Sequence, residues 1–197
     1  TLVVEIWCWS WAYTKILAER DPDGQYIGVD SKSDRMSFGS QYCIERGIKN
    51  VRWIYSQVDH LKSCIPPHSI DHIWITFPDP RPTRDRQKLT SPKYQAIYSS
   101  LLKPWWTIHL KTDDLSFFEY TQKSLIAWWW SISWLKKDIY GEMSSKMNGK
   151  MGNTHSKKIL FNPITSIQTY YETKWLQQGR TIYYLSSSFN KENTGKE

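Results

Sequence analysis

Short apolar runs alternate along this chain with stretches of helical character, and this alternation most limits what the chain can fold into. Each run has the length and apolar content of a strand that is buried on both faces of a sheet. A strand, a helix and a second strand pair in parallel through a right-handed crossover that packs the helix on the sheet. The sequence therefore predicts a doubly wound α/β fold, with a mostly parallel sheet and helices on both faces.

The boundaries of these elements follow from apolar runs, helix caps and turn residues. The expected strands are 2–6, 25–30, 51–55, 70–77, 107–111, 131–139 and 180–185. The expected helices are 13–20, 33–46, 91–102, 115–130 and 164–178. Residues 141–160 are rich in polar residues and glycine and are expected to form a mobile loop, and 186–197 a disordered tail. One domain is therefore expected over residues 1–185.

The charge balance favours a polyanionic partner, because 26 Lys and Arg stand against 19 Asp and Glu and the formal net charge is +7. No uncharged apolar run of about 18 residues is present, so no membrane-spanning helix is expected. The first residues show no secretory signal. The three cysteines lack CxxC spacing, which favours reduced thiols and a cytoplasmic protein. Cysteines and histidines show no metal-ligand spacing, so no metal is expected.

Acidic residues follow several of the expected strands. Glu5 lies near the end of the first strand, Asp30 ends the second, Asp79 follows the fourth, and Asp113 and Asp114 follow the fifth. The carboxyl ends of parallel strands share one edge, and an acid after the second strand typically binds ribose hydroxyls. The alternative for each residue is an acid in a loop that faces water.

Two prolines enclose one carboxylate in Phe77-Pro78-Asp79-Pro80, and they restrict its backbone at low entropic cost. Four cations follow this segment closely. They are Arg81, Arg84, Arg86 and Lys88. Such a cluster beside a rigid acid is typical of a strip that contacts a phosphate backbone, although a solvated charged loop is the alternative.

Several motifs occur in order over nearly the whole chain, from about Val3 to Leu185. They are Val4-Glu5, Ile27-Gly28-Val29-Asp30, Ile73-Trp74-Ile75-Thr76-Phe77-Pro78-Asp79-Pro80, Leu89-Thr90-Ser91, His109-Leu110-Lys111-Thr112-Asp113 and Thr169-Tyr170-Tyr171-Glu172. Together they resemble the bacterial tRNA (guanine-N7)-methyltransferase family. The resemblance implies a Rossmann-like methyltransferase fold, S-adenosylmethionine as methyl donor with S-adenosylhomocysteine as product, and N7 of a variable-loop guanine in tRNA as acceptor. The resemblance is compatible with a protein that is a monomer or a homodimer.

The resemblance also implies roles for individual residues. Contacts to the cofactor are implied for Glu5, Asp30, Gln57, Val58 and Asp79. Of these, Asp30 is expected at the ribose, Gln57 replaces a family acid on the adenine side, and Asp79 is the expected catalytic residue between cofactor and guanine. Contacts to tRNA are implied for Asp113, Thr169, Tyr171 and Glu172, and are expected for the basic residues Arg81, Arg84, Arg86 and Lys88.

Tryptophan stands where that family has glycine at five positions, which are Trp7, Trp9, Trp11, Trp105 and Trp106. All five differences are of one kind, which indicates a systematic replacement. Glycine in the first turn allows positive φ and a close approach to the cofactor. Indoles there are expected to fill the space of the methionine and ribose groups. Alternatively, the indoles at 7, 9 and 11 share one face of an extended strand and pack as core.

The leading hypothesis is therefore an S-adenosylmethionine-dependent tRNA (guanine-N7)-methyltransferase with Asp79 at its centre. One alternative is a non-catalytic RNA-binding protein that keeps the basic residues but has an occluded cofactor pocket. A second is another Rossmann-type methyltransferase with a protein or small-molecule substrate.

Overall fold

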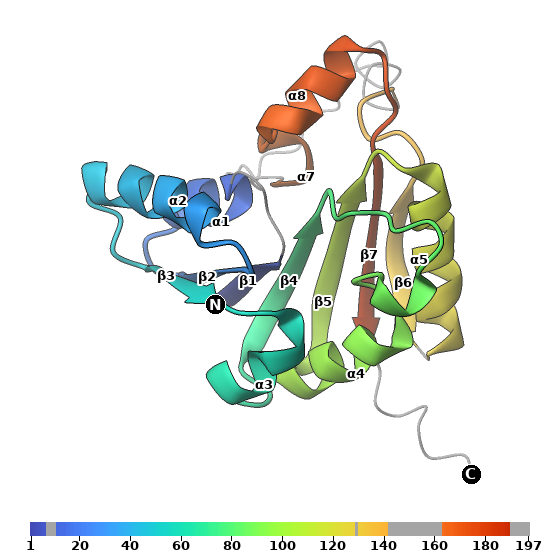
Figure 1. Ribbon diagram of the computed structural model, residues 1–197, viewed down its shortest axis with the longest axis horizontal. Helices are drawn as coiled ribbons and strands as arrows, with labels where there is room; N and C mark the ends of the chain where they lie inside the picture. Colours follow the sequence, from blue (N-terminus) through green and yellow to red (C-terminus); the bar gives the residue numbers. More distant parts are fainter. Residues whose placement is uncertain (7–10, 129, 142–162, 190–197) are drawn as a thin grey trace, which may run out of the picture.

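A seven-stranded sheet in the order β3-β2-β1-β4-β5-β7-β6 runs through the protein (Figure 1). The computed structural model describes residues 1–6, 11–128, 130–141 and 163–189. The strands are β1 (Leu2–Ile6), β2 (Gln25–Asp30), β3 (Val51–Tyr55), β4 (Ile70–Thr76), β5 (Leu102–Thr112), β6 (Trp130–Lys136) and β7 (Tyr183–Phe189). Strands β1 to β5 pair in parallel, whereas β7 is antiparallel to both β5 and β6. The order changes direction between β1 and β4, which is where ligands bind in sheets of this type.

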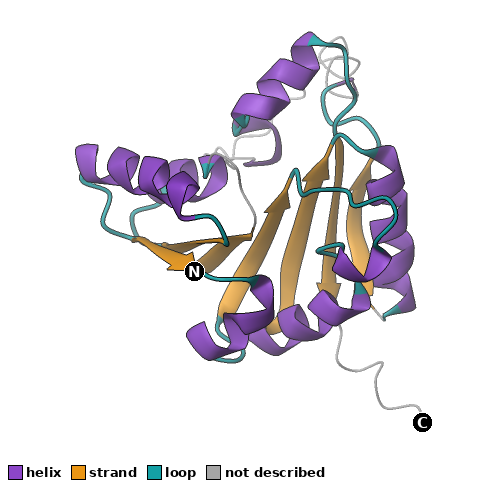
Figure 2. Ribbon diagram, in the orientation of Figure 1, coloured by secondary structure: helices purple, strands orange, loops and turns teal. Residues whose placement is uncertain are grey.

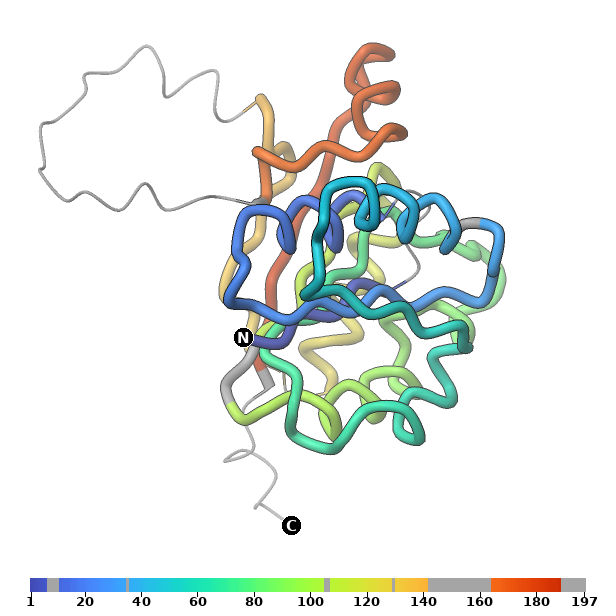
Figure 3. The backbone as a smooth tube through the Cα atoms, turned by 90° about the vertical axis from the view of Figure 1, so that its left-hand side faces the viewer, coloured from blue at the N-terminus to red at the C-terminus, as the bar shows by residue number. Residues whose placement is uncertain are grey.

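Helices cover both faces of the sheet (Figure 2). In the side view, α1 and α2 lie above the sheet and α3 and α4 below it (Figure 3). The helices are α1 (Ala12–Arg20), α2 (Ser33–Glu45), α3 (Leu61–Cys64), α4 (Pro92–Leu101), α5 (Leu115–Ala127), α7 (Pro163–Ser166) and α8 (Tyr170–Gln177), and the short 3-10 turns are η1 (Val58–His60) and η2 (Asp85–Gln87). The predicted doubly wound α/β fold is confirmed.

Two apolar clusters fill the layers between sheet and helices. The cluster shared by α3, α4 and α5 includes Val4, Ile6, Ile73, Ile75, Leu110, Tyr98 and Phe117. The cluster beneath α1 and α2 includes Val3, Tyr13, Leu17, Tyr26, Cys43 and Trp74. Successive residues of β1 thus point to opposite layers, as strand geometry requires. Within the described ranges, no helix has both the length and the apolar character needed to cross a membrane.

Several boundaries differ from the sequence predictions. The expected helix 115–130 ends at Ala127, and the expected strand 131–139 is β6, which spans Trp130–Lys136. The expected helix 164–178 is two helices, because Thr169 caps α8: its Oγ1 accepts from the Glu172 N–H at 3.1 Å, and the Glu172 carboxylate accepts from the Thr169 N–H at 3.2 Å. Strand β5 begins at Leu102, five residues before the expected start at 107. Strand β7 continues to Phe189 because it pairs with β5 and β6, so the expected tail does not begin at 186. The rest of that tail and nearly all of the expected loop at 141–160 lie outside the described residues.

Trp11 precedes α1 and is fully buried in a left-handed conformation, with φ 54° and ψ 26°. Its ring lies 4.9 Å from the Trp53 ring at an interplanar angle of 74°. A Cβ atom on Gly28 would come within 2.5 Å of the Trp11 ring, and one on Gly39 within 2.9 Å. The indole therefore fills the layer between β2 and α2, and the extended-strand alternative is wrong at this position because φ is positive.

We expect the Trp11→Gly variant to be more stable than Trp11→Ala by about 1 kcal/mol. Both variants lose the buried indole, at a cost of about 3–5 kcal/mol, but only alanine keeps the strain of a left-handed backbone. Urea denaturation of both variants measures the difference. At the exposed α5 residue Lys123, alanine is expected to be more stable than glycine. The same order at both positions would contradict the strain at Trp11.

Candidate active site

The predicted acids lie at or just after the carboxyl ends of β1, β2, β4 and β5, which are parallel strands of one sheet. The carboxyl ends of β4 and β5 point toward α7 and α8 (Figure 1). The Glu5 carboxylate is buried; one oxygen accepts from the Thr14 N–H and hydroxyl at 2.8 and 2.6 Å, and the other from the Thr76 hydroxyl at 3.1 Å. Glu5 thus links β1 to α1 and β4. Asp30 is also buried, and its Oδ1 accepts from the Lys32 N–H at 3.0 Å. Contact between these acids and a cofactor stays a prediction.

A cavity of about 320 Å³ opens at this edge, between the ends of β2, β3 and β4 and the start of α4. Its lining residues are Ser31, Gln57, Val58, Asp59, Asp79, Arg81, Gln87, Leu89, Lys93 and Tyr94. Three of the predicted cofactor residues, Gln57, Val58 and Asp79, therefore line the same cavity. The sequence did not single out Asp59, Lys93 or Tyr94.

Asp79 lies in a strained loop at the mouth of this cavity. Its Oδ1 accepts from the Arg81 N–H at 3.2 Å, and its Oδ2 lies 3.6 Å from the Arg81 Nε. The side chain is 58% exposed. Phe77 and Arg81, on either side of the segment, have φ of 49° and 43°. Left-handed conformations of this kind are costly outside glycine and gather at functional sites, and Asp79 between them lines the cavity.

The cavity fits the adenosine part of S-adenosylmethionine in size and lining. Small-molecule sites commonly measure about 300–1,000 Å³ and combine apolar walls with a few polar groups. Here Val58, Leu89 and Tyr94 are buried wall residues, while carboxylates and amides lie around them. Trp11 does not line this cavity. The expectation that indoles fill the space of the methionine and ribose groups stays a prediction. Trp7 and Trp9 lie outside the described residues.

The predicted basic strip divides into exposed and engaged cations. Arg84 and Arg86 are exposed. Arg81 contacts Asp79 and donates to the Gln87 side chain at 2.9 Å. Lys88 is only 4% exposed, pairs with Asp85 at 2.7 Å and lies 4.1 Å from the centroid of the Tyr120 ring. The Lys88 ammonium is therefore engaged within the protein, whereas Arg84 and Arg86 are accessible to a ligand. Their contact with tRNA phosphates stays a prediction.

Glu172 and Lys111 form an ion pair, and both side chains are 0% exposed. The Lys111 Nζ also donates to the carbonyls of Ile164 and Ile167 at 2.7 and 3.3 Å. The Tyr140 hydroxyl donates to Glu172 at 2.7 Å. Burial lowers the pKa of Lys111 to about 8, although Glu172 opposes that shift. Glu172, predicted as a tRNA contact, is thus a buried link between α8 and β5.

The remaining predicted tRNA residues lie around this ion pair. Thr169 is buried as the cap of α8. Asp113 is partly buried and pairs with Arg180 at 2.9 Å. Tyr171 stacks on Trp175 with the ring centroids 5.5 Å apart, and Trp175 contacts Phe77 at 5.0 Å. This aromatic contact joins α8 to the loop that carries Asp79. The sequence signal that could have revealed Lys111 is a lysine inside an apolar strand.

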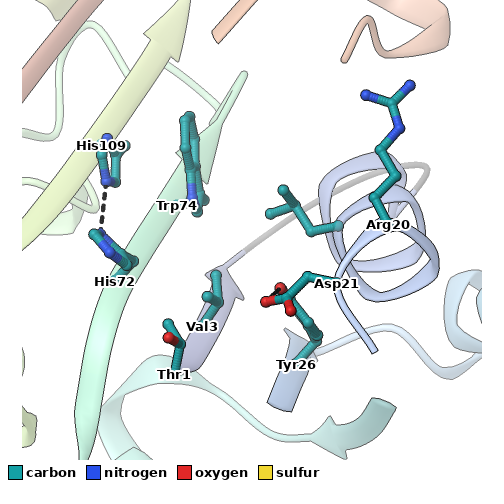
Figure 4. Close-up of a pocket in the computed structure, with 9 residues that line it drawn as sticks. Thr1, Val3, Arg20, Asp21, Tyr26, His72, Trp74 and His109 are labelled. Carbon is teal, nitrogen blue, oxygen red and sulfur yellow. Dashed lines mark hydrogen bonds between the residues drawn. The ribbon is translucent and has the colours of Figure 1, made fainter. Parts of the chain in front are cut away.

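A second cavity, of about 420 Å³, lies away from these residues, near the amino ends of β1 and β2 (Figure 4). His72 and His109 are 3.1 Å apart there, between Nδ1 and Nε2. The His109 ring stacks on Trp74, and burial holds the pKa of His109 well below its usual range. No predicted site residue lines this cavity. Among the described residues, no group of His, Cys, Asp and Glu side chains could hold a metal ion.

Comparisons with known proteins identify methyltransferases as relatives of this chain. A family model for a putative methyltransferase matches residues 1–130. A tRNA (guanine-N(7)-)-methyltransferase of Porphyromonas gingivalis is 31% identical over 185 residues, which are 94% of this chain and 70% of that protein. A protein of the same name from Christiangramia forsetii is 32% identical over 186 residues, covering 93% of this chain and 76% of that protein.

Solved structures of methyltransferases share the fold. The 16S rRNA methyltransferase KamB has a TM-score of 0.68 at 9% identity, covering 96% of this chain and 87% of its own. A SAM-dependent methyltransferase from Aquifex aeolicus has a TM-score of 0.60 at 10% identity, covering 94% and 80%. These likenesses confirm the Rossmann-like methyltransferase fold alone. The sequence relatives, which match nearly the whole chain, decide the family: this chain belongs to the tRNA (guanine-N7)-methyltransferases.

Proposed function

We propose that this protein transfers a methyl group from S-adenosylmethionine to N7 of a variable-loop guanine in tRNA. The observation that carries the proposal is the position of Asp79, which lies in a strained loop at the mouth of the cavity where β2, β3 and β4 end. The relatives that are 31% and 32% identical over most of the chain are named tRNA (guanine-N(7)-)-methyltransferases. We further propose that the protein acts in the cytoplasm, as a monomer or a homodimer.

The chemistry of N7 suits a site without a strong base. Guanine N7 is a lone-pair acceptor and carries no proton that must be removed. When bound, S-adenosylmethionine supplies an electrophilic methyl group. The tasks of the protein are to align the base, which contributes several kcal/mol when the geometry is right, and to oppose the positive charge that develops on the purine. The Asp79 carboxylate performs the second task, because a fixed negative charge stabilises such a transition state.

The direct test is methyl transfer to an unmodified tRNA transcript. The protein is incubated with S-adenosylmethionine and the transcript, and 7-methylguanosine is measured in the nuclease digest. A transcript with adenine at the variable-loop position is the matched control. The Trp7→Gly/Trp9→Gly variant is assayed in parallel, so that a blocked cofactor turn is distinguished from a different function. If both proteins bind tRNA and neither methylates it, the non-catalytic RNA-binding alternative replaces this proposal.

A salt titration is expected to separate the exposed arginines from Lys88. Each phosphate contact that is lost reduces the steepness of the slope of log tRNA affinity against log salt concentration by about 0.7–0.9. We therefore expect a flatter slope for Arg84→Ala/Arg86→Ala and an unchanged slope for Lys88→Ala, whose ammonium pairs with Asp85. Filter binding at several salt concentrations measures both slopes. Equal flattening in the two variants would contradict the engagement of Lys88.

A further inference from the structure

Tyr120 of α5 contacts the basic segment 81–88, although the motifs of the sequence assign this tyrosine no role. The segment follows β4 and reaches α5 (Figure 1). There the Tyr120 hydroxyl donates to the Asp85 carbonyl at 3.2 Å, and the Lys88 ammonium lies 4.1 Å from the centroid of the Tyr120 ring. One side chain of α5 therefore binds both the backbone and a cation of the segment.

The position of Tyr120 is itself fixed, because α5 is packed against the core. Phe117 and Thr121 of this helix are fully buried. The Thr121 hydroxyl lies 2.7 Å from the hydroxyl of Thr90, which follows the basic segment, and the Ser124 hydroxyl donates to the Thr90 carbonyl at 3.1 Å. The helix thus holds the segment through Tyr120 at its middle and through Thr90 just beyond its end.

Two carbonyl oxygens in the middle of the segment are held by donors of the protein. The Asp85 carbonyl accepts from the Lys88 N–H at 3.1 Å as well as from Tyr120. The Arg86 carbonyl accepts from the Ser91 hydroxyl at 3.1 Å. These bonds restrict the backbone of residues 85 and 86, and they engage two oxygens that would otherwise repel an anionic ligand.

The charges of the segment are arranged to suit an anion. Asp85 is the one acid in the sequence from 81 to 88, and the nearly buried Lys88 ammonium lies 2.7 Å from its Oδ1. Arg84 and Arg86, on either side of Asp85, are exposed. Residues 82–87 line a surface hollow of about 440 Å³. A phosphate group at this hollow would meet two arginines beside an acid whose charge Lys88 offsets.

We propose that Tyr120 is a positioning residue for tRNA, which fixes the backbone at Asp85 and the ammonium of Lys88 so that the neighbouring arginines meet the phosphate backbone in a preformed segment. The inference rests on the proposed function, because it requires that tRNA binds at these arginines. Tyr120 acts here without touching the RNA. A segment that is ordered before binding loses less conformational freedom when the ligand binds, and this increases affinity.

The test measures the binding of an unmodified tRNA transcript by filter binding. Tyr120→Phe removes the hydroxyl but keeps the ring beside the Lys88 ammonium, so the cation–π contact remains. We expect the dissociation constant to rise about 3- to 10-fold, the size of one hydrogen bond. Tyr120→Leu also removes the ring and is expected to weaken binding further than Tyr120→Phe does.

A double-mutant cycle connects this effect to the arginines. In the Arg84→Ala/Arg86→Ala background, adding Tyr120→Phe is expected to change the dissociation constant by less than about 2-fold. The segment then has no exposed arginine left to position. A role of Tyr120 that is independent of the two arginines would give the same loss in both backgrounds.

Tyr42→Phe is the matched control on α2, on the other face of the sheet (Figure 3). It also removes a tyrosine hydroxyl that donates to a neighbouring segment, since the Tyr42 hydroxyl donates to Glu19 at 2.9 Å. It is expected to leave tRNA binding unchanged. Melting curves check that each variant is folded.

Two results would overturn the role of Tyr120 and leave the proposed function intact. One is an unchanged dissociation constant in folded Tyr120→Phe and Tyr120→Leu, including the case in which only their melting temperatures fall. The other is an equal loss of affinity with and without Arg84 and Arg86. Absence of tRNA binding by the unaltered protein would overturn both this inference and the proposed function.

Discussion

The Asp79→Asn variant is expected to lose turnover by roughly 10²-fold or more, while its affinity for tRNA changes little. Asparagine keeps the shape of the side chain and can still accept from the Arg81 N–H, which lies 3.2 Å from Oδ1. It removes the charge that opposes the cationic purine in the transition state. Single-turnover methylation and tRNA binding, measured on the same preparation, separate the two effects.

The control for Asp79 is the thermal stability of the variant. If the carboxylate serves only to fix the loop through its contact with Arg81, Asp79→Asn would melt at a lower temperature and each folded molecule would keep full turnover. Asp23→Asn makes the same chemical change at an exposed turn and is expected to alter neither quantity. Full methyl transfer by Asp79→Asn would remove Asp79 from the catalytic role.

The Glu172→Gln variant is expected to lower the free energy of unfolding by about 3–5 kcal/mol, the usual effect of removing one partner of a buried ion pair. Glutamine keeps the shape of the side chain but has one acceptor oxygen, so it can accept from either the Tyr140 hydroxyl or the Thr169 N–H, which reach different oxygens of the Glu172 carboxylate. The Lys111 ammonium, however, stays in the interior without its counter-charge. Urea denaturation monitored by tryptophan fluorescence measures the loss.

Glu119→Gln provides the matched control for Glu172, because it makes the same substitution at an exposed position of α5. It is expected to change stability by less than about 0.5 kcal/mol. If Glu172 were instead a direct and independent tRNA contact, Glu172→Gln would weaken tRNA binding without destabilising the protein. That outcome would contradict the structural role of the Lys111–Glu172 pair.

Most of the architecture could be predicted from local patterns. The runs that became β1, β2 and β4 are short and mostly apolar, which is typical of strands buried on both faces of a parallel sheet. The prolines around Asp79 mark the end of β4 because they cannot continue the ladder. The position of Asp79 at the carboxyl edge follows from strand direction alone. The grouping of Gln57 and Val58 with Asp79 in one cavity agrees with the resemblance that suggested it.

The misplaced boundaries have a common cause: the local sequence pattern predicted one structure, and a hydrogen-bonding interaction stabilised another. The helical pattern of 164–178 is interrupted because Thr169 takes a capping geometry, which its hydroxyl stabilises. The serines that were expected to begin a tail lie in β7, since their backbone pairs with β5 and β6. Strand pairing satisfies backbone groups whatever the side chain, so polar residues can lie in the middle of a sheet.

The sequence by itself determined the order of strands and helices, the edge at which the acids gather and, through its motifs, the family. The tertiary structure alone decided which charged side chains are available to a ligand. Lys88 and Arg84 are both cations in one basic segment, yet Lys88 is buried against Asp85 and Tyr120 while Arg84 is exposed. Glu172 meets Lys111 across 61 residues of sequence. The pairing and burial of a side chain depend on distances between segments that are far apart in the chain. A buried charge without a partner is so costly that each buried charged residue must pair with another group inside the fold.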